Sequence, residues 1–304
     1  MSTALVNATN LSVAYKNNEI VLSDLNFTIP AGPGILGLIG ANGAGKTTLL
    51  RVIAGQLAFR GECLVGSASP FDNQHHMDHT ILTGIDSPFP GDWRVKHIFK
   101  AGGYRWVTWD QDAAETLALR FGVDVEKRYR ELSRGQRSAV GVIVALASGC
   151  SLVLLDEPYL GLDVSKRGEF YRVLTEYAEI GDRTFIISTH HLNEISALLD
   201  RVMLIGAGRV VLNGVIDDIV EQVLEITGTT EAVDRLISQL GVTGAVRHRS
   251  DQAGATKLVL DLRQFPKLVD ELYTCAGRLN VRVAECTLEK AVLAITEPQY
   301  EELT

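Results

Sequence analysis

Cysteine, excess positive charge and long apolar runs are all scarce in this sequence of 304 residues. Its 4 cysteines are widely scattered and form no C-x-x-C pair, so we expect buried thiols in a reducing compartment rather than a disulfide framework. The 29 Lys and Arg residues are outnumbered by 37 Asp and Glu residues. The resulting formal charge of -8 argues against nucleic acid as a partner.

The sequence also lacks a segment that could span a membrane. Its longest apolar run, Ala139 to Ala147, is far shorter than the ~18 residues that a membrane-spanning helix needs. The N-terminus, Met1 to Thr9, has no basic stretch followed by an apolar one, so we expect no signal peptide. We therefore expect a cytoplasmic protein that reaches a membrane only through a partner.

The composition is that of a folded, globular protein. Hydrophobic residues make up 46% of the chain and charged residues 22%. The length favours one large domain with a small appendage. From the pattern of elements, we predict a main domain over residues 1–220 and a small accessory domain over residues 221–304.

The main domain has the pattern of an α/β fold with additional β and helical parts. Alternation of apolar and polar residues predicts antiparallel strands at its start, apolar runs predict buried parallel strands later, and capping residues mark the helices. The predicted strands are Ala4 to Tyr15, Val21 to Ile29, Ile35 to Ile39, Ser151 to Leu155, Thr184 to Ser188 and a hairpin of Val202 to Ile205 with Arg209 to Leu212. The predicted helices are Lys46 to Ala54, a mostly helical region from Trp93 to Ala147 that includes helices starting at Asp110 and Ser133, and Ser165 to Ile180.

The accessory domain has the order strand, helix, strand, strand, helix, strand, which is typical of the ferredoxin-like α+β motif. These elements are predicted at Val223 to Ile226, Glu231 to Leu240, Ala245 to Arg249, Lys257 to Leu262, Phe265 to Ala276 and Val281 to Glu285.

A phosphate-binding loop stands between a predicted strand and a predicted helix. Its pattern is G-x-x-x-x-G-K-[ST], written here as Gly40-Ala41-Asn42-Gly43-Ala44-Gly45-Lys46-Thr47 and followed by Thr48. Glycines let backbone N–H groups converge on phosphate oxygens, Lys46 reaches the outer phosphates, and Thr47 is placed to ligate Mg²⁺. The loop predicts a nucleoside triphosphate as ligand.

Two further motifs resemble the ABC ATPases. Leu132-Ser133-Arg134-Gly135-Gln136-Arg137 lies one helix before Leu152-Val153-Leu154-Leu155-Asp156-Glu157-Pro158. The resemblance covers residues from Ala4 to Gly214. It implies a P-loop NTPase fold of the ABC type, with a mixed sheet core, an antiparallel β subdomain and a helical subdomain.

The resemblance assigns roles to the acidic residues and to a histidine. Asp156 would hold Mg²⁺ at the end of its strand, and Glu157 would be the base that polarises the attacking water. His190, in Ser188-Thr189-His190, would contact the γ-phosphate of ATP. The alternatives are that Asp156 and Glu157 cap the next turn, and that His190 has a core or surface role.

The remaining family motifs concern the second subunit, the adenine ring and the coupling loop. By resemblance, Ser133, Arg134, Gly135 and Gln136 would form the signature, which in this family faces ATP held by a partner subunit; Arg134 replaces a usual glycine. Asp163 belongs to the D-loop. Tyr15 either stacks on adenine or packs on the core. Asp86 stands where the family has a glutamine, and we assign it to Mg²⁺.

The most specific resemblance is to the ATPases of bacterial ABC-2-type exporters, carried by Tyr104-Arg105-Trp106, Trp109-Asp110 and Cys286 to Ala291. It implies a subunit that uses ATP and Mg²⁺, dimerises with a copy of itself or another such subunit, and drives a separately encoded membrane permease. A soluble regulatory or assembly ATPase and a nucleotide sensor without turnover are the alternatives.

Two groups of residues keep other interpretations open. We interpret His75-His76-Met77-Asp78-His79 as a solvated loop between β elements rather than a metal cluster, because no zinc-site spacing accompanies it. Trp93, Trp106 and Trp109 either line the groove that receives the permease or pack in a core.

Overall fold

The computed structural model describes residues 4–15, 19–84 and 89–296, and the chain divides into two compact units. The first unit comprises residues 1–191 and 197–213, and the second comprises residues 192–196 and 214–304. The domain boundary after residue 220 remains a prediction from the sequence pattern.

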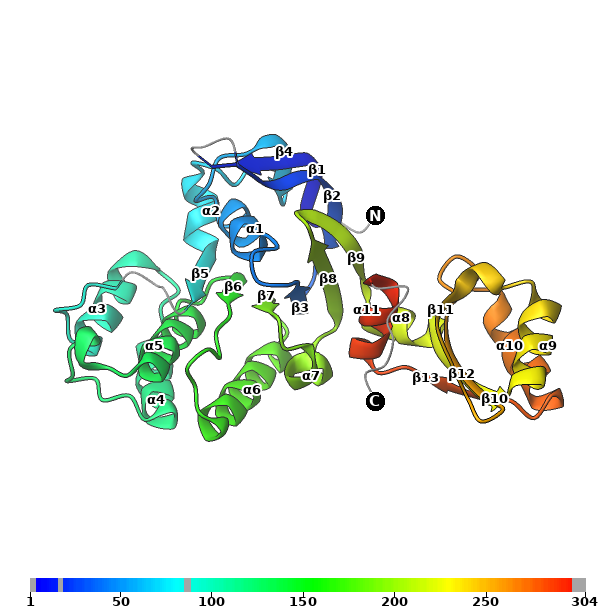
Figure 1. The fold of residues 1–304 in the computed structure, drawn as a ribbon. Coiled ribbons are helices and arrows are strands. Elements are labelled where there is room, and N and C mark those ends of the chain that lie inside the picture. The colour runs from blue at the N-terminus through cyan, green and yellow to red at the C-terminus, as the bar shows by residue number, and fades with distance from the viewer. Residues whose placement is uncertain (1–3, 16–18, 85–88, 297–304) are drawn as a thin grey trace. The chain divides into compact units, whose positions relative to one another are not determined.

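A six-stranded sheet forms the centre of the first unit (Figure 1). In spatial order its strands are β5 (Thr80–Gly84), β6 (Leu152–Asp156), β7 (Thr184–Thr189), β3 (Gly34–Ile39), β8 (Arg201–Gly206) and β9 (Arg209–Val215). The first five are parallel to one another. The parallel strands are apolar and almost fully buried because both faces of such a sheet are covered, as their unbroken apolar runs predict.

The predicted closing hairpin is confirmed at the edge of this sheet. The strands β8 and β9 are joined by Ala207 and Gly208, whose φ angles are 47° and 71°. Two successive positive φ values characterise the tight turn that matches the twist of an antiparallel pair. Gly208 also approaches the backbone oxygen of Val21 so closely that an added Cβ would lie 2.4 Å from it.

A three-stranded antiparallel sheet covers one side of the unit. Its strand order is β2 (Ile20–Pro30), β1 (Ala4–Ala14) and β4 (Arg60–Val65), so the predicted opening strands are confirmed. The helix α1 (Lys46–Ile53) lies between this sheet and the central one (Figure 1) and shares one apolar cluster with both. Burial of the α1 side chains therefore fixes the end of the phosphate loop against two sheets.

The helical region of the first unit is confirmed and consists of three helices and a short turn. These are α3 (Val95–Arg105), α4 (Gln111–Phe121), η1 (Tyr129–Glu131) and α5 (Arg134–Ala147). Asp110 and Ser133 cap α4 and α5 through side-chain oxygens that accept backbone N–H groups, as their residue types predict. The helix α6 (Val164–Glu179) joins β6 to β7.

The histidine-rich segment is a helix, α2 (Gln74–His79), so its interpretation as a solvated loop was wrong. Asn73 caps this helix by accepting a hydrogen bond from the backbone N of His76. The His76 ring is buried and its Nε2 lies 2.6 Å from the Ile53 carbonyl oxygen, and burial lowers the pKa of His76. Among the described residues, no group of three or more His, Cys, Asp or Glu side chains is arranged to hold a metal ion.

The second unit has the predicted ferredoxin-like arrangement. Its sheet runs β11 (Val246–Gln252), β12 (Ala255–Asp261), β10 (Val223–Thr229) and β13 (Arg282–Glu285), with every neighbouring pair antiparallel. One face packs on α9 (Thr230–Leu240) and α10 (Leu268–Arg278), and the other carries α8 (Ile216–Gln222) and α11 (Leu288–Thr296) (Figure 1). The short elements that remain in the chain are α7 (Leu192–Ile195), η2 (Ser196–Leu198) and η3 (Thr243–Ala245).

The structure describes all four cysteines. Cys63, Cys150 and Cys286 are buried and Cys275 is half-buried, all as free thiols. Burial raises the pKa of the Cys63 thiol to about 12, which keeps it protonated and unreactive.

In the part of the chain that the structure describes, none of the helices combines the length and the apolarity needed to cross a bilayer.

A buried carboxylate on β12 offers a test of the second unit. Asp261 is 4% exposed and accepts hydrogen bonds from Arg263 at 2.9 Å and from Arg247 at 3.2 Å. Burial by itself raises the pKa of Asp261, but the hydrogen bonds and charge of Arg263 and the charge of Arg247 outweigh it, so this pKa lies below its usual value. The ionised carboxylate therefore stabilises the folded state above the unfolded pKa of about 3.9, and this stabilisation is lost as the pH falls through the lower, folded pKa.

We predict that Asp261→Asn lowers the free energy of unfolding by about 1–3 kcal/mol at pH 7, because both arginines lose an ionic partner but remain partly exposed to water. The difference from the wild type should shrink as the pH falls below about 4. Urea denaturation of the full chain measures it. All three tryptophans lie in the first unit, so the shift should be larger in far-UV circular dichroism than in tryptophan fluorescence.

The matched control is Glu231→Gln, which removes an exposed ion pair with Arg235 on α9 of the same unit. This change should cost less than about 1 kcal/mol. Equal losses for the two variants, or an Asp261→Asn loss that is unchanged in acid, would contradict the assigned role of Asp261.

Candidate nucleotide-binding and catalytic site

The phosphate loop connects β3 to α1 and requires its glycines. Gly43 and Gly45 have φ angles of 81° and 104°, in the region that favours glycine. At Gly40 an added Cβ would lie 2.5 Å from the Ile205 oxygen, and at Gly45 it would lie 2.5 Å from a methyl group of Leu22. The close packing at these two positions explains why each of them is a glycine.

Lys46 is held at the mouth of this loop. Its side chain is almost fully buried, and Nζ donates to the carbonyl oxygens of Gly40 at 2.7 Å and Ala41 at 3.2 Å. Nζ also lies 3.6 Å from Oε1 of Glu157. A lysine ammonium group has three donors, so this geometry places a positive charge where it can exchange carbonyl partners for phosphate oxygens.

Asp156 connects the start of α1 to two neighbouring strands. The Thr47 hydroxyl donates to Asp156 Oδ2 at 2.7 Å, and the Ser188 hydroxyl donates to Asp156 Oδ1 at 2.5 Å. Asp156 and Ser188 are register partners at the carboxyl ends of β6 and β7. A threonine hydroxyl beside a carboxylate is a set of hard oxygen donors that fits Mg²⁺.

Glu157 lies at the centre of a second set of contacts. Its φ angle is 49°, an uncommon value for a residue with a side chain, and it turns the chain directly after β6. The backbone N of Glu157 donates to Ser188 Oγ at 2.9 Å. Its carboxylate accepts from Tyr159 at 3.1 Å and lies 2.9 Å from His190 Nδ1 through both oxygens. The strained backbone thus aims a carboxylate, 13% exposed, between a lysine and a histidine.

Tyr15 lies beside this site. Its hydroxyl is 3.3 Å from Thr48 Oγ1 on α1, and its side chain is 40% exposed. The structure therefore places an accessible aromatic ring next to the phosphate loop, and its stacking on adenine stays a prediction. Asp86 lies outside the described residues, so its assignment to Mg²⁺ also stays a prediction.

The signature and the D-loop form a second group of contacts in the same chain. Ser133 and Gln136 cap each other at the start of α5, with backbone-to-side-chain distances of 3.1 and 3.2 Å. Gly135 packs on the loop that carries Asp163, because an added Cβ would lie 2.3 Å from the Gly161 oxygen. Asp163 caps α6 by accepting from Lys166 N at 2.9 Å. Ser133, Arg134 and Asp163 are nevertheless exposed, so this surface is open to a partner.

The three tryptophans have different surroundings. Trp109 packs against α3, where an added Cβ on Gly102 would lie 2.4 Å from its ring, and Trp106 stacks on Trp109. Trp106 also lines a cavity of about 300 Å³ in the first unit. Trp93 is 43% exposed. Packing is therefore seen for Trp109, whereas a groove that receives the permease stays a prediction.

Sequence reasoning missed two residues of the catalytic cluster. The sequence pattern assigns no role to Ser188 in Ser188-Thr189-His190, although its position opposite Asp156 follows once β6 and β7 are paired. Tyr159 was not considered, because its contact with Glu157 depends on the turn after β6.

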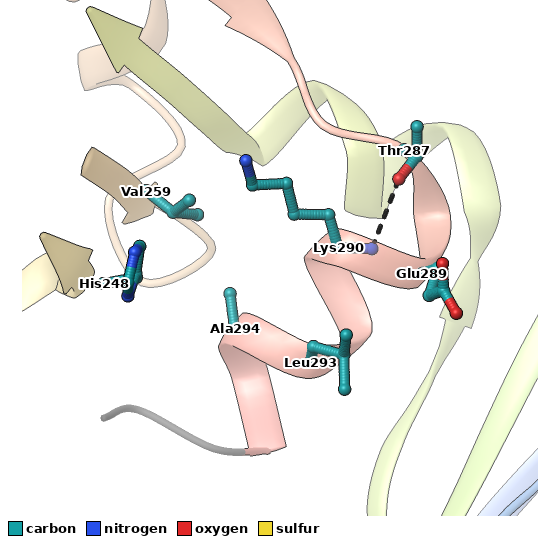
Figure 2. Close-up of a pocket in the computed structure, with 7 residues that line it drawn as sticks. All are labelled: His248, Val259, Thr287, Glu289, Lys290, Leu293 and Ala294. Carbon is teal, nitrogen blue, oxygen red and sulfur yellow. Dashed lines mark hydrogen bonds between the residues drawn. The ribbon is translucent and has the colours of Figure 1, made fainter. Parts of the chain in front are cut away.

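A cavity of about 250 Å³ in the second unit contains none of the predicted site residues (Figure 2).

Comparisons with known proteins identify the family. The family model described as ABC transporter matches residues 22–160. An uncharacterized ABC transporter ATP-binding protein of Methanocaldococcus jannaschii, MJ1023, is 32% identical over 212 residues, which is 67% of this chain and 76% of that protein. The ABC transporter ATP-binding protein YtrB of Bacillus subtilis is 27% identical over 285 residues, or 92% of both chains.

Other relatives match this chain over different shares of its length. The daunorubicin/doxorubicin resistance ATP-binding protein DrrA of Streptomyces peucetius is 26% identical over 303 residues, covering 92% of this chain and 89% of that protein. Shorter matches include a molybdenum import ATP-binding protein, ModC of Brucella abortus, which is 32% identical and covers 64% of this chain. This chain covers 57% of that protein.

A solved structure of the ATP-binding subunit of an ABC transporter shares the fold. Its TM-score is 0.62 at 23% identity, over 72% of this chain and 92% of that one. The chain has a glycine-rich phosphate loop beside Asp156 and Glu157, and its matches to known proteins agree with that site. These matches show that the chain belongs to the family of ABC transporter ATP-binding proteins, which are ATPases coupled to transport.

Proposed function

We propose that two copies of this subunit bind ATP and Mg²⁺ between them and that hydrolysis drives export through a separately encoded membrane permease, which holds the subunit at the cytoplasmic face. The observation that carries the proposal is the Glu157 carboxylate. It lies 3.6 Å from Lys46 Nζ and 2.9 Å from His190, beside the hydrogen-bonded pair of Thr47 and Asp156. A base, a cation and a metal-ligand pair in one cluster are what phosphoryl transfer from ATP to water requires.

Nucleotide binding would use the loop and its neighbours. The backbone N–H groups of Gly40 to Thr47 and the ammonium of Lys46 bind the phosphates, and the exposed ring of Tyr15 stacks on adenine. The Thr47 hydroxyl and the Asp156 carboxylate would hold Mg²⁺. The metal supplies positive charge that neutralises the phosphate oxygens.

Hydrolysis would use Glu157 and His190. Glu157 accepts a proton as the water oxygen forms a bond to the γ-phosphorus, and the bond to the bridging oxygen breaks with its electron pair leaving on ADP. His190, hydrogen-bonded to Glu157, orients the carboxylate and contacts the γ-phosphate. The products are ADP and phosphate.

The partner subunit would complete the site through the signature. Ser133 lies at the N-terminal cap of the 14-residue helix α5 and is exposed, so its hydroxyl and the first amides of α5 can meet phosphate held by a second copy. Asp163 is exposed beside it and belongs to the same surface. Two such surfaces in a symmetric pair face two phosphate loops, as an isologous dimer requires.

The direction of transport is inferred from relatives that match nearly the whole chain. An alignment over 92% of the chain, such as that with DrrA, necessarily includes most of the second unit, whereas the match to ModC covers 64%. The name of DrrA refers to resistance to two drugs, and removal of a drug from the cell is a direct route to resistance. This likeness favours export over import.

The cavity beside Trp106 is the surface we propose for the permease. It lies in the first unit between β5, α2 and the helical region, with Ile81, Phe89 and Val144 among its apolar lining residues. The Trp106 indole N–H is buried and has no hydrogen-bond partner among the described residues. A backbone carbonyl of a permease segment that inserts between Trp106 and its neighbours would supply that partner.

We predict that Glu157→Gln lowers the ATP turnover rate by about 10²- to 10⁴-fold, because the amide cannot accept the proton, while the Kd for ATP changes little. Turnover and equilibrium nucleotide binding by the purified chain measure the two effects. Glu179→Gln, on the exposed end of α6, is the matched control and should keep the wild-type rate. Undiminished hydrolysis by Glu157→Gln would remove Glu157 as the base.

A complementation experiment tests the shared site. Lys46→Ala removes the phosphate cation, and Ser133→Asp keeps the helix cap but opposes the phosphate charge of the partner. Each variant should be inactive by itself. In an equimolar mixture half of the dimers have one intact site of two, so we expect about a quarter of the wild-type turnover. A mixture as inactive as its components would exclude a homodimer with shared sites.

A variant of Trp106 tests the coupling to a membrane protein. We predict that Trp106→Phe leaves the basal turnover unchanged and lowers its stimulation by the candidate permease in liposomes by about 2- to 10-fold, the value of one lost hydrogen bond. Trp93→Phe is the control. If the wild-type chain itself does not respond to the permease, the soluble regulatory ATPase becomes the better interpretation.

A further inference from the structure

Tyr159 is a large polar residue that the proposed mechanism does not use. It lies in the turn between β6 and α6, two residues after Glu157, and is 1% exposed. Its hydroxyl donates to Glu157 Oε2 at 3.1 Å and is also hydrogen-bonded to Thr189 Oγ1. One buried hydroxyl therefore contacts both the carboxylate and the strand that leads to His190.

The ring of Tyr159 is held from several sides, so its hydroxyl has a defined position. The guanidinium of Arg167 on α6 lies 5.9 Å from the ring centroid, and the His191 ring lies 6.2 Å from it. Thr189 Oγ1, the second partner of the hydroxyl, accepts a hydrogen bond from His191 N at 2.8 Å. The backbone oxygen of Pro158 accepts from Ser138 on α5 at 2.7 Å, which anchors the turn itself.

The protonation state of the Tyr159 hydroxyl is also defined. Burial raises the pKa of Tyr159, and the nearby Glu157 carboxylate raises it further, against the hydrogen bond from Thr189. The phenol therefore keeps its proton near neutral pH, and the proton is available to the carboxylate. A donor fixed on one carboxylate oxygen restricts rotation of the whole group.

The two oxygens of Glu157 consequently have different surroundings. Oε2 is bound by Tyr159, whereas Oε1 is the oxygen that lies 3.6 Å from Lys46 Nζ at the phosphate loop. His190 Nδ1 is equidistant from both, so it does not distinguish them. The contact of Tyr159 with Oε2 and that of Lys46 with Oε1 therefore act together to turn Oε1 toward the loop.

We propose that Tyr159 is a positioning residue for hydrolysis, whose hydroxyl anchors Oε2 of Glu157 to Thr189 and so presents Oε1 to the attacking water. This inference rests on the proposed role of Glu157 as the base. It assigns to Tyr159 an effect on the turnover rate rather than on nucleotide affinity, because the contacts of its hydroxyl are with the proposed base Glu157 and with Thr189.

Tyr159→Phe tests the inference in the full chain, because it keeps the ring and removes only the hydroxyl. We expect kcat for ATP to fall by about 3- to 30-fold while KM and the Kd for ATP stay within about twofold. Tyr177→Phe on α6 is the matched control and should keep the wild-type kcat. A wild-type kcat for Tyr159→Phe would overturn the inference.

A double-mutant cycle separates positioning from a general structural effect. If Tyr159 acts through Glu157, adding Tyr159→Phe to Glu157→Gln should leave the residual rate nearly unchanged. A fall by the same factor in both backgrounds would overturn the inference. Near-wild-type turnover of Glu157→Gln itself would instead refute the proposed base, an outcome that does not depend on Tyr159.

Variants of Thr189 keep the inference testable if Tyr159→Phe lowers the thermal midpoint strongly. Thr189→Val removes the second partner of the phenol with little change in volume and should also lower kcat at constant KM. Thr189→Ser retains the hydroxyl and should restore kcat to within about twofold of the wild type. Equal kcat values for the two Thr189 variants would contradict the proposed link.

Discussion

The carboxylate of Asp156 holds together three segments that are far apart in the chain. It accepts one hydrogen bond from Thr47 at the start of α1 and another from Ser188 at the end of β7. Parallel strands with a common register bring their carboxyl ends to one edge of the sheet, so the pairing of β6 with β7 places these groups within bonding distance. Without that register, the phosphate loop and the acidic pair would be separate motifs.

The same edge of the central sheet brings opposite charges together in a partly buried site. The side chains of Lys46 and Glu157 are both largely buried, with Nζ 3.6 Å from Oε1, and His190 Nδ1 lies 2.9 Å from the same carboxylate. Attraction between such charges is several-fold stronger than in water, where two unit charges about 4 Å apart gain only about 1 kcal/mol. The Glu157 carboxylate therefore partly balances the charge of Lys46 at the end of the phosphate loop.

The second unit has its own basis of stability. Its four-stranded sheet buries a separate apolar cluster against α9 and α10, and the buried Asp261 is neutralised by two arginines. It also has a cavity of about 250 Å³ between α11 and the strands β11 and β12 (Figure 2). Thr287 caps α11 there by accepting from Lys290 N at 3.3 Å. The matches to YtrB and DrrA each cover 92% of the chain and so include most of this unit.

Local chemistry in the sequence determined much of this protein. The glycines around Lys46, the capping residues Asp110 and Ser133, and the unbroken apolar runs of the parallel strands each act within a few residues, so their outcome could be predicted. The ferredoxin-like order of the second unit followed from alternating strand and helix patterns in the same way.

Only the tertiary structure decided the rest. His76 is buried in a helix because Ile53 offers it a carbonyl partner from another element, and Tyr159 meets Glu157 because the backbone turns at a positive φ after β6. Such contacts depend on the positions of atoms from distant segments, which no local pattern of residues specifies.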